Sequence, residues 1–250
     1  PLYLTNYMTT PIAHLISMSS LTNVMDREIE NVINKFPGTV AVLTKTQASS
    51  FTFGDKMICI PNGIDISQYN FCQNPDSSLA WSGRISPEKG LEDAFAAAEI
   101  TQIPLKIFGF KQDENYWNKI NQDYPNAPVE YRGFLSTSQL QNELGKCRGL
   151  LVTPRWIEAF GNVALEAFAC GVPLITYQRG GLSEIVENGK TGWLVEPDSV
   201  SGLVEAISKL DQINRFSCRQ QAESQYSLKA MGLRLENWFE DILKNFSNQE

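Results

Sequence analysis

Short apolar runs alternate with amphipathic stretches of helical length through most of this chain, and this alternation limits the fold more than any other feature. The runs have the length of strands. The stretches between them place apolar residues on one face at helical spacing, as in the series Leu91, Ala94, Phe95 and Ala98. Strands and helices in this order form βαβ units, whose strands pair into a parallel sheet with helices on both faces. We therefore predict an α/β, Rossmann-like fold.

The predicted elements are regular from residue 79 onward and less regular before it. We predict strands at residues 79–82, 103–109, 129–133, 149–154, 172–177 and 191–197, and helices at residues 87–99, 136–147, 162–170 and 198–210. Two more helices are predicted within residues 214–246. The first 70 residues give strands at 9–18, at 38–46 and from 56 into a turn at 61–63, with a helix at 22–36.

Chain length and cysteine usage indicate the class of protein. The chain has 250 residues, of which 42% are hydrophobic, and this size suits one large domain or one and a half ordinary ones. Its five cysteines are odd in number and show no Cys-x-x-Cys spacing, which favours a reduced chain and argues against a metal site. No apolar run reaches the roughly 18–20 residues of a membrane span. We therefore expect a cytoplasmic protein without a transmembrane segment.

The net charge of −7 limits the choice of partners. Nucleic-acid backbones are bound by faces rich in lysine and arginine, and anionic lipid surfaces attract the same side chains. The acidic balance therefore argues against a nucleic acid as the main partner and disfavours electrostatic docking on a membrane.

Two glutamates lie around a predicted helix start, just after the strand at 149–154. Glu158 and Glu166 are eight positions apart, and Gly161-Asn162 opens the helix between them. Ligands of open parallel sheets bind beyond the carboxyl ends of the strands, and a helix start offers free N–H groups to a phosphate. Carboxylates accept hydrogen bonds from sugar hydroxyls, so one glutamate would hold a ribose and the other a hexose. The alternative, a surface loop residue and a solvated helix residue, stays open at this point.

Cationic side chains follow two other predicted strands. Arg84 follows the strand at 79–82, and Lys89 comes five residues later. An arginine fork and a lysine point charge together suit a diphosphate, although two surface cations would look the same in sequence. Arg132 lies at the end of the strand at 129–133, where it either stacks on a base or is simply exposed.

Other residue types give weaker signals. His14 is the only histidine, so it can form neither a histidine metal cluster nor an arguable serine–histidine–acid triad, and a packed or surface position is its simplest interpretation. No Asp-x-Asp pair is present to hold a divalent metal against a diphosphate. Gly180-Gly181 precedes a helix that contains Glu184, and a tight turn explains this pair by default.

Three blocks of sequence, taken together and in this order, resemble a known family. GRISPEKG at 83–90, EAFGNVALEAFACGVPLI at 158–175 and GGLSEIVENGKTGWLVEPDSV at 180–200 are similar to the signature blocks of the family-4 (group 1) retaining glycosyltransferases of the GT-B fold. PNGIDISQY at 61–69 resembles the linker between their domains. The resemblance covers residues 36–245 and is dense from 79 to 210.

The resemblance implies two Rossmann-like domains that face each other across a cleft. It places part of the N-terminal, acceptor-side domain at residues 1–65, the nucleotide-sugar domain at 66–225, and a helix that crosses back at 226–250. It implies donor-binding roles for Gly83, Arg84, Lys89, Arg132, Glu158, Phe160, Gly161, Asn162, Val163 and Glu166.

Within this set each residue has an implied task. Arg84 and Lys89 bind the diphosphate, and Glu158 holds the sugar together with the backbone at 160–162. The amide of Val163 assists with phosphate, Glu166 binds the ribose, and Arg132 lies beside the base. Glu158, Arg84 and Lys89 are the implied catalytic residues, and the resemblance implies neither a metal nor a cofactor besides the nucleotide-sugar substrate.

The chain also departs from the family pattern. A complete member carries a whole N-terminal domain, of which the last third at most is present, so a fragment of a longer protein is one hypothesis; the chain starts at Pro1 without a signal-peptide pattern. Ser17, rather than His14, lies near the place of the family's usual histidine. The segments at 9–20 and 45–56 resemble cyanobacterial enzymes that glucosylate reduced pterins.

The leading hypothesis is a retaining transferase that moves glucose from UDP-glucose to a small-molecule or lipid acceptor, with a pterin among the candidates. One alternative is a nucleotide-sugar-binding module without turnover, and another is a nucleotide-sugar epimerase on the same fold. The sequence does not discriminate UDP from ADP or GDP, and it leaves the acceptor and the oligomeric state open.

Overall fold

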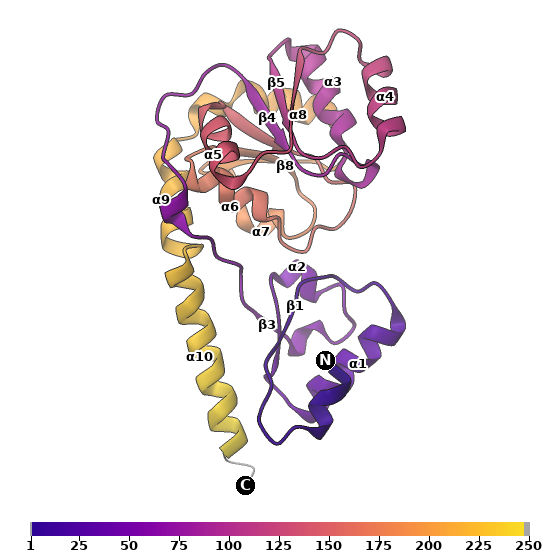
Figure 1. The fold of residues 1–250 in the computed structure, drawn as a ribbon, viewed down its shortest axis with the longest axis vertical. Helices are drawn as coiled ribbons and strands as arrows, with labels where there is room; N and C mark the ends of the chain where they lie inside the picture. Colours follow the sequence, from indigo (N-terminus) through magenta and orange to yellow (C-terminus); the bar gives the residue numbers. More distant parts are fainter. Residues whose placement is uncertain (1, 248–250) are drawn as a thin grey trace.

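The computed structural model describes residues 2–247 and contains two parallel sheets and a long C-terminal helix that joins them (Figure 1). The smaller sheet has the strand order β1-β2-β3, with β1 at His14–Ile16, β2 at Val40–Val42 and β3 at Ile58–Cys59. The predicted strands at 9–18, at 38–46 and from 56 onward are therefore present but shorter than expected. The helices of this part are η1 (Leu2–Tyr7), α1 (Asn23–Lys35), α2 (Lys45–Ala48) and η2 (Gly54–Lys56).

The larger sheet has six strands in the order β6-β5-β4-β7-β8-β9, and neighbouring strands pair in parallel. The strands are β4 (Leu79–Ser82), β5 (Leu105–Phe108), β6 (Val129–Gly133), β7 (Gly149–Val152), β8 (Leu174–Tyr177) and β9 (Gly192–Val195). The prediction of a parallel, Rossmann-like α/β sheet is confirmed. The strand order reverses between β4 and β7, and ligands of such sheets bind at this switch point.

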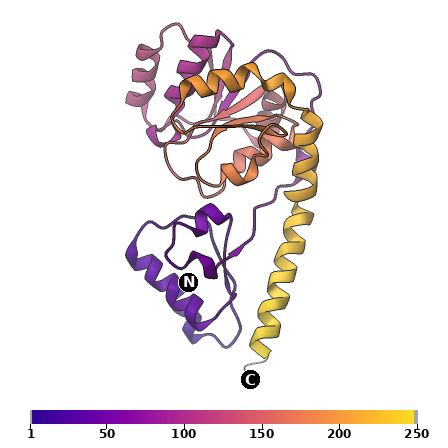
Figure 2. The ribbon, with the colours of Figure 1, turned by 180° about the vertical axis from the view of Figure 1, so that it is seen from behind.

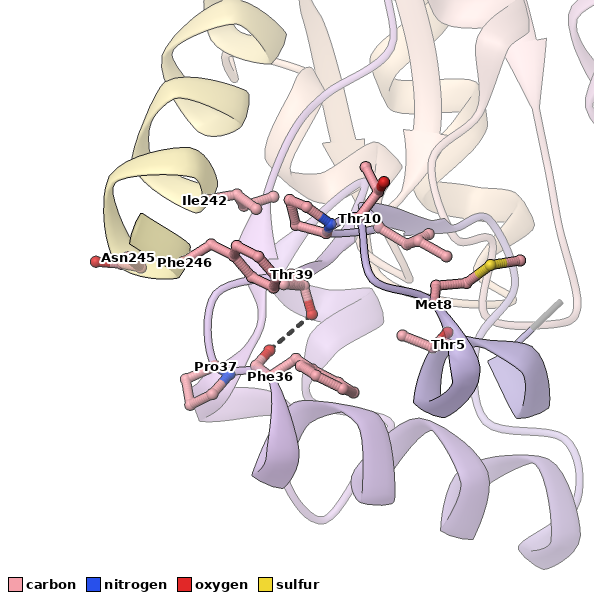
Figure 3. A pocket seen from close by; sticks show the side chains of 11 residues that line it. Thr5, Met8, Thr10, Phe36, Pro37, Thr39, Ile242, Asn245 and Phe246 are labelled. Carbon is pink, nitrogen blue, oxygen red and sulfur yellow. Dashed lines mark hydrogen bonds between the residues drawn. The ribbon is translucent and has the colours of Figure 1, made fainter. Parts of the chain in front are cut away.

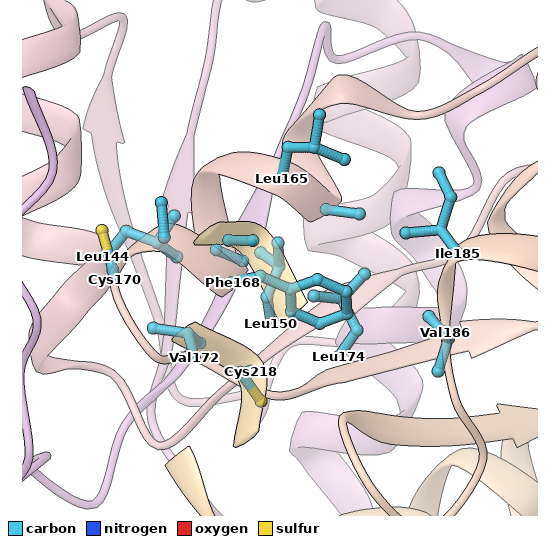
Figure 4. Close-up of a cluster of buried hydrophobic side chains, with 14 of the residues drawn as sticks. Leu144, Leu150, Leu165, Phe168, Cys170, Val172, Leu174, Ile185, Val186 and Cys218 are labelled. Carbon is cyan, nitrogen blue, oxygen red and sulfur yellow. The ribbon is translucent and has the colours of Figure 1, made fainter. Parts of the chain in front are cut away.

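Helices on both faces of the larger sheet bury two apolar clusters. The helices are α3 (Leu91–Thr101), α4 (Glu114–Asp123), α5 (Thr137–Lys146), α6 (Asn162–Ala169), α7 (Leu182–Ile185), α8 (Val200–Ser208) and α9 (Arg215–Gln225). Side chains of α3 and α8 pack on one face, where Trp81 and Tyr177 are fully buried. Those of α5, α6 and α9 pack on the other, around Phe168 (Figure 4).

Two features of these helices differ from the prediction. The helix predicted at 87–99 is interrupted, because η4 (Pro87–Lys89) ends at Gly90, whose φ is 62°. A Cβ atom at Gly90 would lie 2.0 Å from the carbonyl oxygen of Thr153, so only glycine fits there. Helix α4 was not predicted at all; Tyr116, Trp117 and Ile120 pack against the core, but the rest of its sequence is polar.

The C-terminal helix α10 (Leu228–Ser247) leaves the larger sheet and runs back along the smaller one (Figures 1 and 2). Its Trp238 donates a hydrogen bond to the carbonyl oxygen of Gly38 at 2.6 Å, and Ile242 joins an apolar cluster with Ala41 and Ile60. A cavity of about 30 Å³ remains where the end of α10 meets the end of α1 (Figure 3), and it has room for little more than a water molecule.

The chain crosses between the two sheets at a pair of adjacent segments. The amide of Ile64 donates to the carbonyl of Tyr226 at 2.8 Å, and the amide of Leu228 donates to the carbonyl of Ile64 at 3.0 Å. The predicted domain boundaries at 65/66 and 225/226 lie beside this crossing, which η3 (Ile66–Gln68) follows. Within residues 2–247, no helix combines the length and the apolar character that a membrane crossing demands.

Candidate functional site

A cavity of about 440 Å³ opens beyond the carboxyl ends of β4 and β7, at the switch point of the larger sheet. Of the predicted site residues, it brings together Gly83, Arg84, Lys89, Glu158, Gly161, Asn162 and Val163. Residues 77 positions apart in sequence, Arg84 and Gly161, therefore line one hollow, as the parallel sheet requires.

Two further cavities adjoin this one. A mostly apolar cavity of about 330 Å³ shares residues 82–84 with it and is otherwise lined by Phe108, Gly109, Phe110, Phe134, Leu135 and Leu140. On the other side, a cavity of about 470 Å³ shares Trp156, Glu158, Gly161 and Asn162 with it, and its opposite wall is formed by residues 17–21 of the N-terminal part. The three cavities form a continuous series from β5 and β6 to the smaller sheet.

An ion pair lies where the central cavity meets the one that faces the smaller sheet. Lys89 Nζ is 2.9 Å from both carboxylate oxygens of Glu158, and the indole N–H of Trp156 donates to Glu158 Oε2 at 2.7 Å. Lys89 Nζ also lies 5.0 Å from the centre of the Trp156 ring. These contacts fix the orientation of the carboxylate. A lysine has three N–H donors, so at least one remains for an anion when Glu158 takes two.

The loop that carries Glu158 is anchored from beneath by a buried polar network. Arg155 donates to Asp93 at 2.7 Å, and the Tyr177 hydroxyl donates to the other oxygen of Asp93 at 2.6 Å. Burial raises the pKa of Asp93, although the Tyr177 hydrogen bond and the Arg155 charge oppose this shift. The sequence did not single out Asp93, Arg155, Trp156 or Tyr177, because nothing in their spacing shows that they meet.

The start of α6 points free backbone N–H groups at the central cavity. The first residues of a helix have no acceptor within it, and among the described residues no acceptor is found for the amides of Asn162 and Val163. Gly161 has a φ of 99°, and a Cβ atom there would lie 2.5 Å from the Leu182 side chain. Asn62, in the segment that joins the two sheets, donates to Asn162 Oδ1 at 2.9 Å.

Arg84 lies at the mouth of the central cavity and at the boundary with the apolar one. Its guanidinium forms an ion pair of 2.7 Å with Glu88, four residues later, and half of its side chain is exposed. Such an exposed pair is weak, so the guanidinium is available to a stronger anion such as a diphosphate.

Glu166 lies one helical turn after Asn162 and is half-buried. Among the described residues its carboxylate has no hydrogen-bond partner, and burial raises its pKa. Tyr69 is close by, because the Glu166 charge is the second cause, after burial, that raises the pKa of Tyr69 to about 12. Glu166 lines none of the three cavities described above.

The structure does not bring Arg132 to these cavities. Its guanidinium is ion-paired with Glu130 at 2.6 Å and with Glu143 at 3.3 Å, on the surface of β6 and α5. At the end of β6, Phe134 and Leu135 line the apolar cavity instead. The role expected for Arg132 beside a base therefore stays a prediction, and in this structure two carboxylates hold its side chain away from the cavities.

Phe160 and His14 are mainly packing residues. The Phe160 side chain is buried against Tyr226, so only its backbone and its edge reach the cavity that faces the smaller sheet. His14 is buried in β1, with Nε2 2.7 Å from the Thr5 hydroxyl, and burial lowers its pKa. It lies outside the three cavities, whereas Ser17 lines the one that faces the smaller sheet. Over residues 2–247, no three histidine, cysteine, aspartate or glutamate side chains group closely enough to hold a metal ion.

Comparison with solved structures confirms the fold. The structure of the Anabaena protein HepE in complex with UDP-glucose matches 96% of this chain and 75% of its own, with a TM-score of 0.81 at 19% identity. A sucrose-phosphate synthase from Thermosynechococcus elongatus matches 97% of this chain and 71% of its own, with a TM-score of 0.78 at 18% identity. These neighbours are GT-B glycosyltransferases, so the α/β architecture seen here is the GT-B fold.

Sequence comparison identifies relatives of the larger sheet and its surroundings. A glycogen synthase of Mycobacterium tuberculosis is 34% identical over 161 residues, which are 59% of this chain and 38% of the relative. An uncharacterized glycosyltransferase of Methanocaldococcus jannaschii is 33% identical over 170 residues, 66% of this chain and 46% of the relative. The matched region is thus less than half of either relative. The family model described as glycosyl transferases group 1 matches residues 72–225. The chain belongs to the group 1 glycosyl transferases.

Proposed function

We propose that this chain transfers glucose from UDP-glucose to a hydroxyl of a small-molecule or lipid acceptor, with retention of the anomeric configuration and without a metal. The observation that carries this proposal is the Lys89–Glu158 pair, which lies beside the free amides of α6 and between two further cavities. This arrangement offers a cation, helix amides and a carboxylate within one hollow, as an activated sugar requires.

The donor would extend along the series of cavities. Its diphosphate lies between Arg84, Lys89 and the start of α6, where three sources of positive charge meet. Its base enters the apolar cavity lined by Phe108 and Phe134. Glu166 receives the ribose hydroxyls, and Glu158 receives hydroxyls of the glucose.

The chemistry follows from where charge develops. The bond between the sugar C1 and the diphosphate oxygen breaks, and its electron pair goes to the diphosphate. Arg84, Lys89 and the α6 amides stabilise that growing charge without reorganising, which is the usual source of the largest catalytic effect. The acceptor oxygen bonds to C1 from the same face, and its proton passes to the departing phosphate. Lys89 and Trp156 hold the carboxylate of Glu158, which in turn orients the sugar.

The acceptor would occupy the cavity of about 470 Å³ between Glu158 and residues 17–21. Its wall combines serine hydroxyls with the apolar side chains of Met18, Leu21 and Ile157. Hydroxyls and apolar surfaces together suit a flat, hydroxylated ring, which keeps a reduced pterin among the candidates. The cytoplasmic location is part of the same proposal.

The test has two stages. A thermal-shift panel of UDP-glucose, ADP-glucose and GDP-mannose should show the largest stabilisation with UDP-glucose, since a ligand at 100 times its Kd adds about 2.7 kcal/mol to folding. Incubation with UDP-glucose should then release UDP, and NMR should show the α configuration in the first glucose product. If another donor gave the largest stabilisation, that donor would take the place of UDP-glucose in this proposal. A β product would exclude retention.

A binding module without turnover is the second candidate. Its support is that the chain matches only 38% and 46% of the two sequence relatives above, so residues that complete catalysis in them need not be present here. It predicts stabilisation by the donor without release of glucose or UDP. Detection of either product, at a rate that Glu158→Gln abolishes, would exclude it.

A further inference from the structure

The carboxylate of Glu184 joins the two parts of the molecule. Glu184 lies on α7, beside the larger sheet, yet it accepts hydrogen bonds from the backbone amide of Lys45 at 3.0 Å and from the amide and hydroxyl of Thr46. These donors open α2, which Figure 1 shows at the end of the N-terminal part that faces α7. The amides at a helix start carry partial positive charge, so a carboxylate is a favoured partner there.

A second contact lies next to the first. The hydroxyl of Thr44 donates to the carbonyl of Ala159 at 2.8 Å, and Thr44 is buried. Ala159 directly follows Glu158, so the N-terminal part contacts the loop that carries the proposed sugar-binding acid. Thr44 also caps α2 through the amide of Gln47. The same short segment therefore holds both Glu184 and the Glu158 loop.

The Glu158 loop and the start of α7 form one rigid unit. The amide of Gly181 donates to the carbonyl of Glu158 at 2.7 Å. Cβ atoms at Gly180 and Gly181 would lie 2.6 Å from the Glu158 carbonyl oxygen and 2.5 Å from that of Ala159. The glycine pair thus allows two backbones to touch, which is a stronger reason for it than a tight turn. Because Gly181 begins the helix that carries Glu184, a displacement of this helix would also move the backbone of Glu158.

We propose that Glu184 and Thr44 form a clamp between the two parts, and that Glu184 is a positioning residue for sugar transfer. The clamp sets the separation between Glu158 and residues 17–21, which are the two walls of the cavity proposed for the acceptor. The central and base cavities are lined only by residues of the larger part, so the clamp affects the UDP moiety less than the sugar, which Glu158 contacts. This proposal rests on the proposed function, because it assigns the clamp a role in that reaction.

The test compares Glu184→Gln with a matched control, Glu187→Gln. Glu187 lies three residues later, and its carboxylate is bound by Lys190 of its own segment instead of by the N-terminal part. In Glu184→Gln one acceptor oxygen remains, whereas the N–H₂ group faces a backbone donor, so the contact and its charge are weakened while the size of the side chain is kept. Loss of alignment by about 1 Å can slow a reaction on the order of 100-fold.

The two measurements are calorimetry with UDP and the rate of UDP release from UDP-glucose. Glu184→Gln should bind UDP within threefold of the parent Kd and release UDP from UDP-glucose at least 10-fold more slowly. Glu187→Gln should match the parent in both, and Glu184→Asp, which keeps the charge, should restore part of the rate. Parent-like UDP release by Glu184→Gln, or an equal loss in binding and rate, overturns the clamp.

Hydrogen exchange separates failure of the clamp from failure of the proposed function. If the parent does not bind UDP-glucose or does not release UDP, the proposed function fails, and the clamp is then judged by exchange alone. At least one of the amides of Lys45 and Thr46 should exchange at least 10-fold faster in Glu184→Gln than in the parent or in Glu187→Gln. Equal exchange at these two amides shows that Glu184 does not hold the N-terminal part, and this overturns the clamp.

Discussion

Replacing Glu166 by glutamine should affect the binding of UDP and the stability of the folded protein in different directions. The carboxylate is half-buried on α6 and has no hydrogen-bond partner among the described residues. Without a ligand, no described group therefore compensates the cost of burying it. We expect Glu166→Gln to weaken UDP binding and, near neutral pH, to make the protein equally or more stable.

The loss in binding follows from the proposed contact with the ribose. A hydrogen bond to a charged group contributes about 1.5–3 kcal/mol. Glutamine keeps one acceptor oxygen and loses the other together with the charge, so the expected loss corresponds to about a 10- to 150-fold rise in the Kd for UDP. Calorimetry at fixed pH measures this directly, and a Kd within twofold of the parent would remove Glu166 from the ribose site.

The effect on stability has a definite sign. Burial raises the pKa of Glu166 in the folded state, so the folded protein binds this proton more tightly than the unfolded chain does. Stability that depends on this proton is present below the ordinary glutamate pKa and is lost as pH rises through the raised value. The parent should therefore lose free energy of unfolding relative to Glu166→Gln over that window.

Glu143→Gln is the matched control, because the pKa of Glu143 moves in the opposite direction. A hydrogen bond from Lys146 is the main cause that lowers the pKa of Glu143, and the Arg132 charge adds to it. Its stabilising contribution is present above the ordinary pKa and is lost in acid, so Glu143→Gln should be the less stable protein at neutral pH. It should bind UDP as the parent does. Thermal unfolding followed from pH 4 to 8 tests both signs, and identical pH profiles for the two variants would refute the reasoning.

Two other substitutions test the site. Lys89→Met keeps the apolar stem but removes the cation, and a loss of about 2–4 kcal/mol of transition-state stabilisation should slow UDP release roughly 30- to 1,000-fold; a rate within threefold of the parent would exclude Lys89 from the diphosphate site. Gly181→Ala places a Cβ atom 2.5 Å from the Ala159 carbonyl oxygen, so it should lower the melting temperature by several degrees and slow UDP release. Gly232→Ala, where nothing lies within 4 Å of the added atom, should do neither.

The sequence predicted the larger sheet well because its signal is local. Most strands are short apolar runs, the edge strand β6 being the exception, and helices such as α3 and α8 show apolar positions at helical spacing, so order and type follow from periodicity. Helix α4 was missed because only Tyr116, Trp117 and Ile120 of its ten residues are apolar or aromatic, and its remaining residues are polar. The strands of the N-terminal part were predicted too long, because apolar residues such as Met18 continue past them into exposed positions.

The site was predictable only in part, and the reason is again physical. Residues that follow parallel strands meet at one edge of the sheet, so Arg84, Lys89 and Glu158 could be placed together from their positions alone. The partners that hold them could not. The contact of Trp156 with Glu158 and that of Glu184 with α2 depend on how loops and whole parts pack, which no spacing encodes. Arg132 shows the converse, since carboxylates on β6 and α5 determine its position.

Calorimetric titration of the parent and of Glu158→Gln with UDP-glucose and with UDP tests the central claim most directly. The parent should bind one UDP-glucose, in competition with UDP, and Glu158→Gln should weaken the binding of UDP-glucose much more than that of UDP, because Glu158 contacts the sugar. Absence of binding to the parent, or an equal effect of the substitution on both ligands, would contradict the assignment of this cavity to a nucleotide sugar.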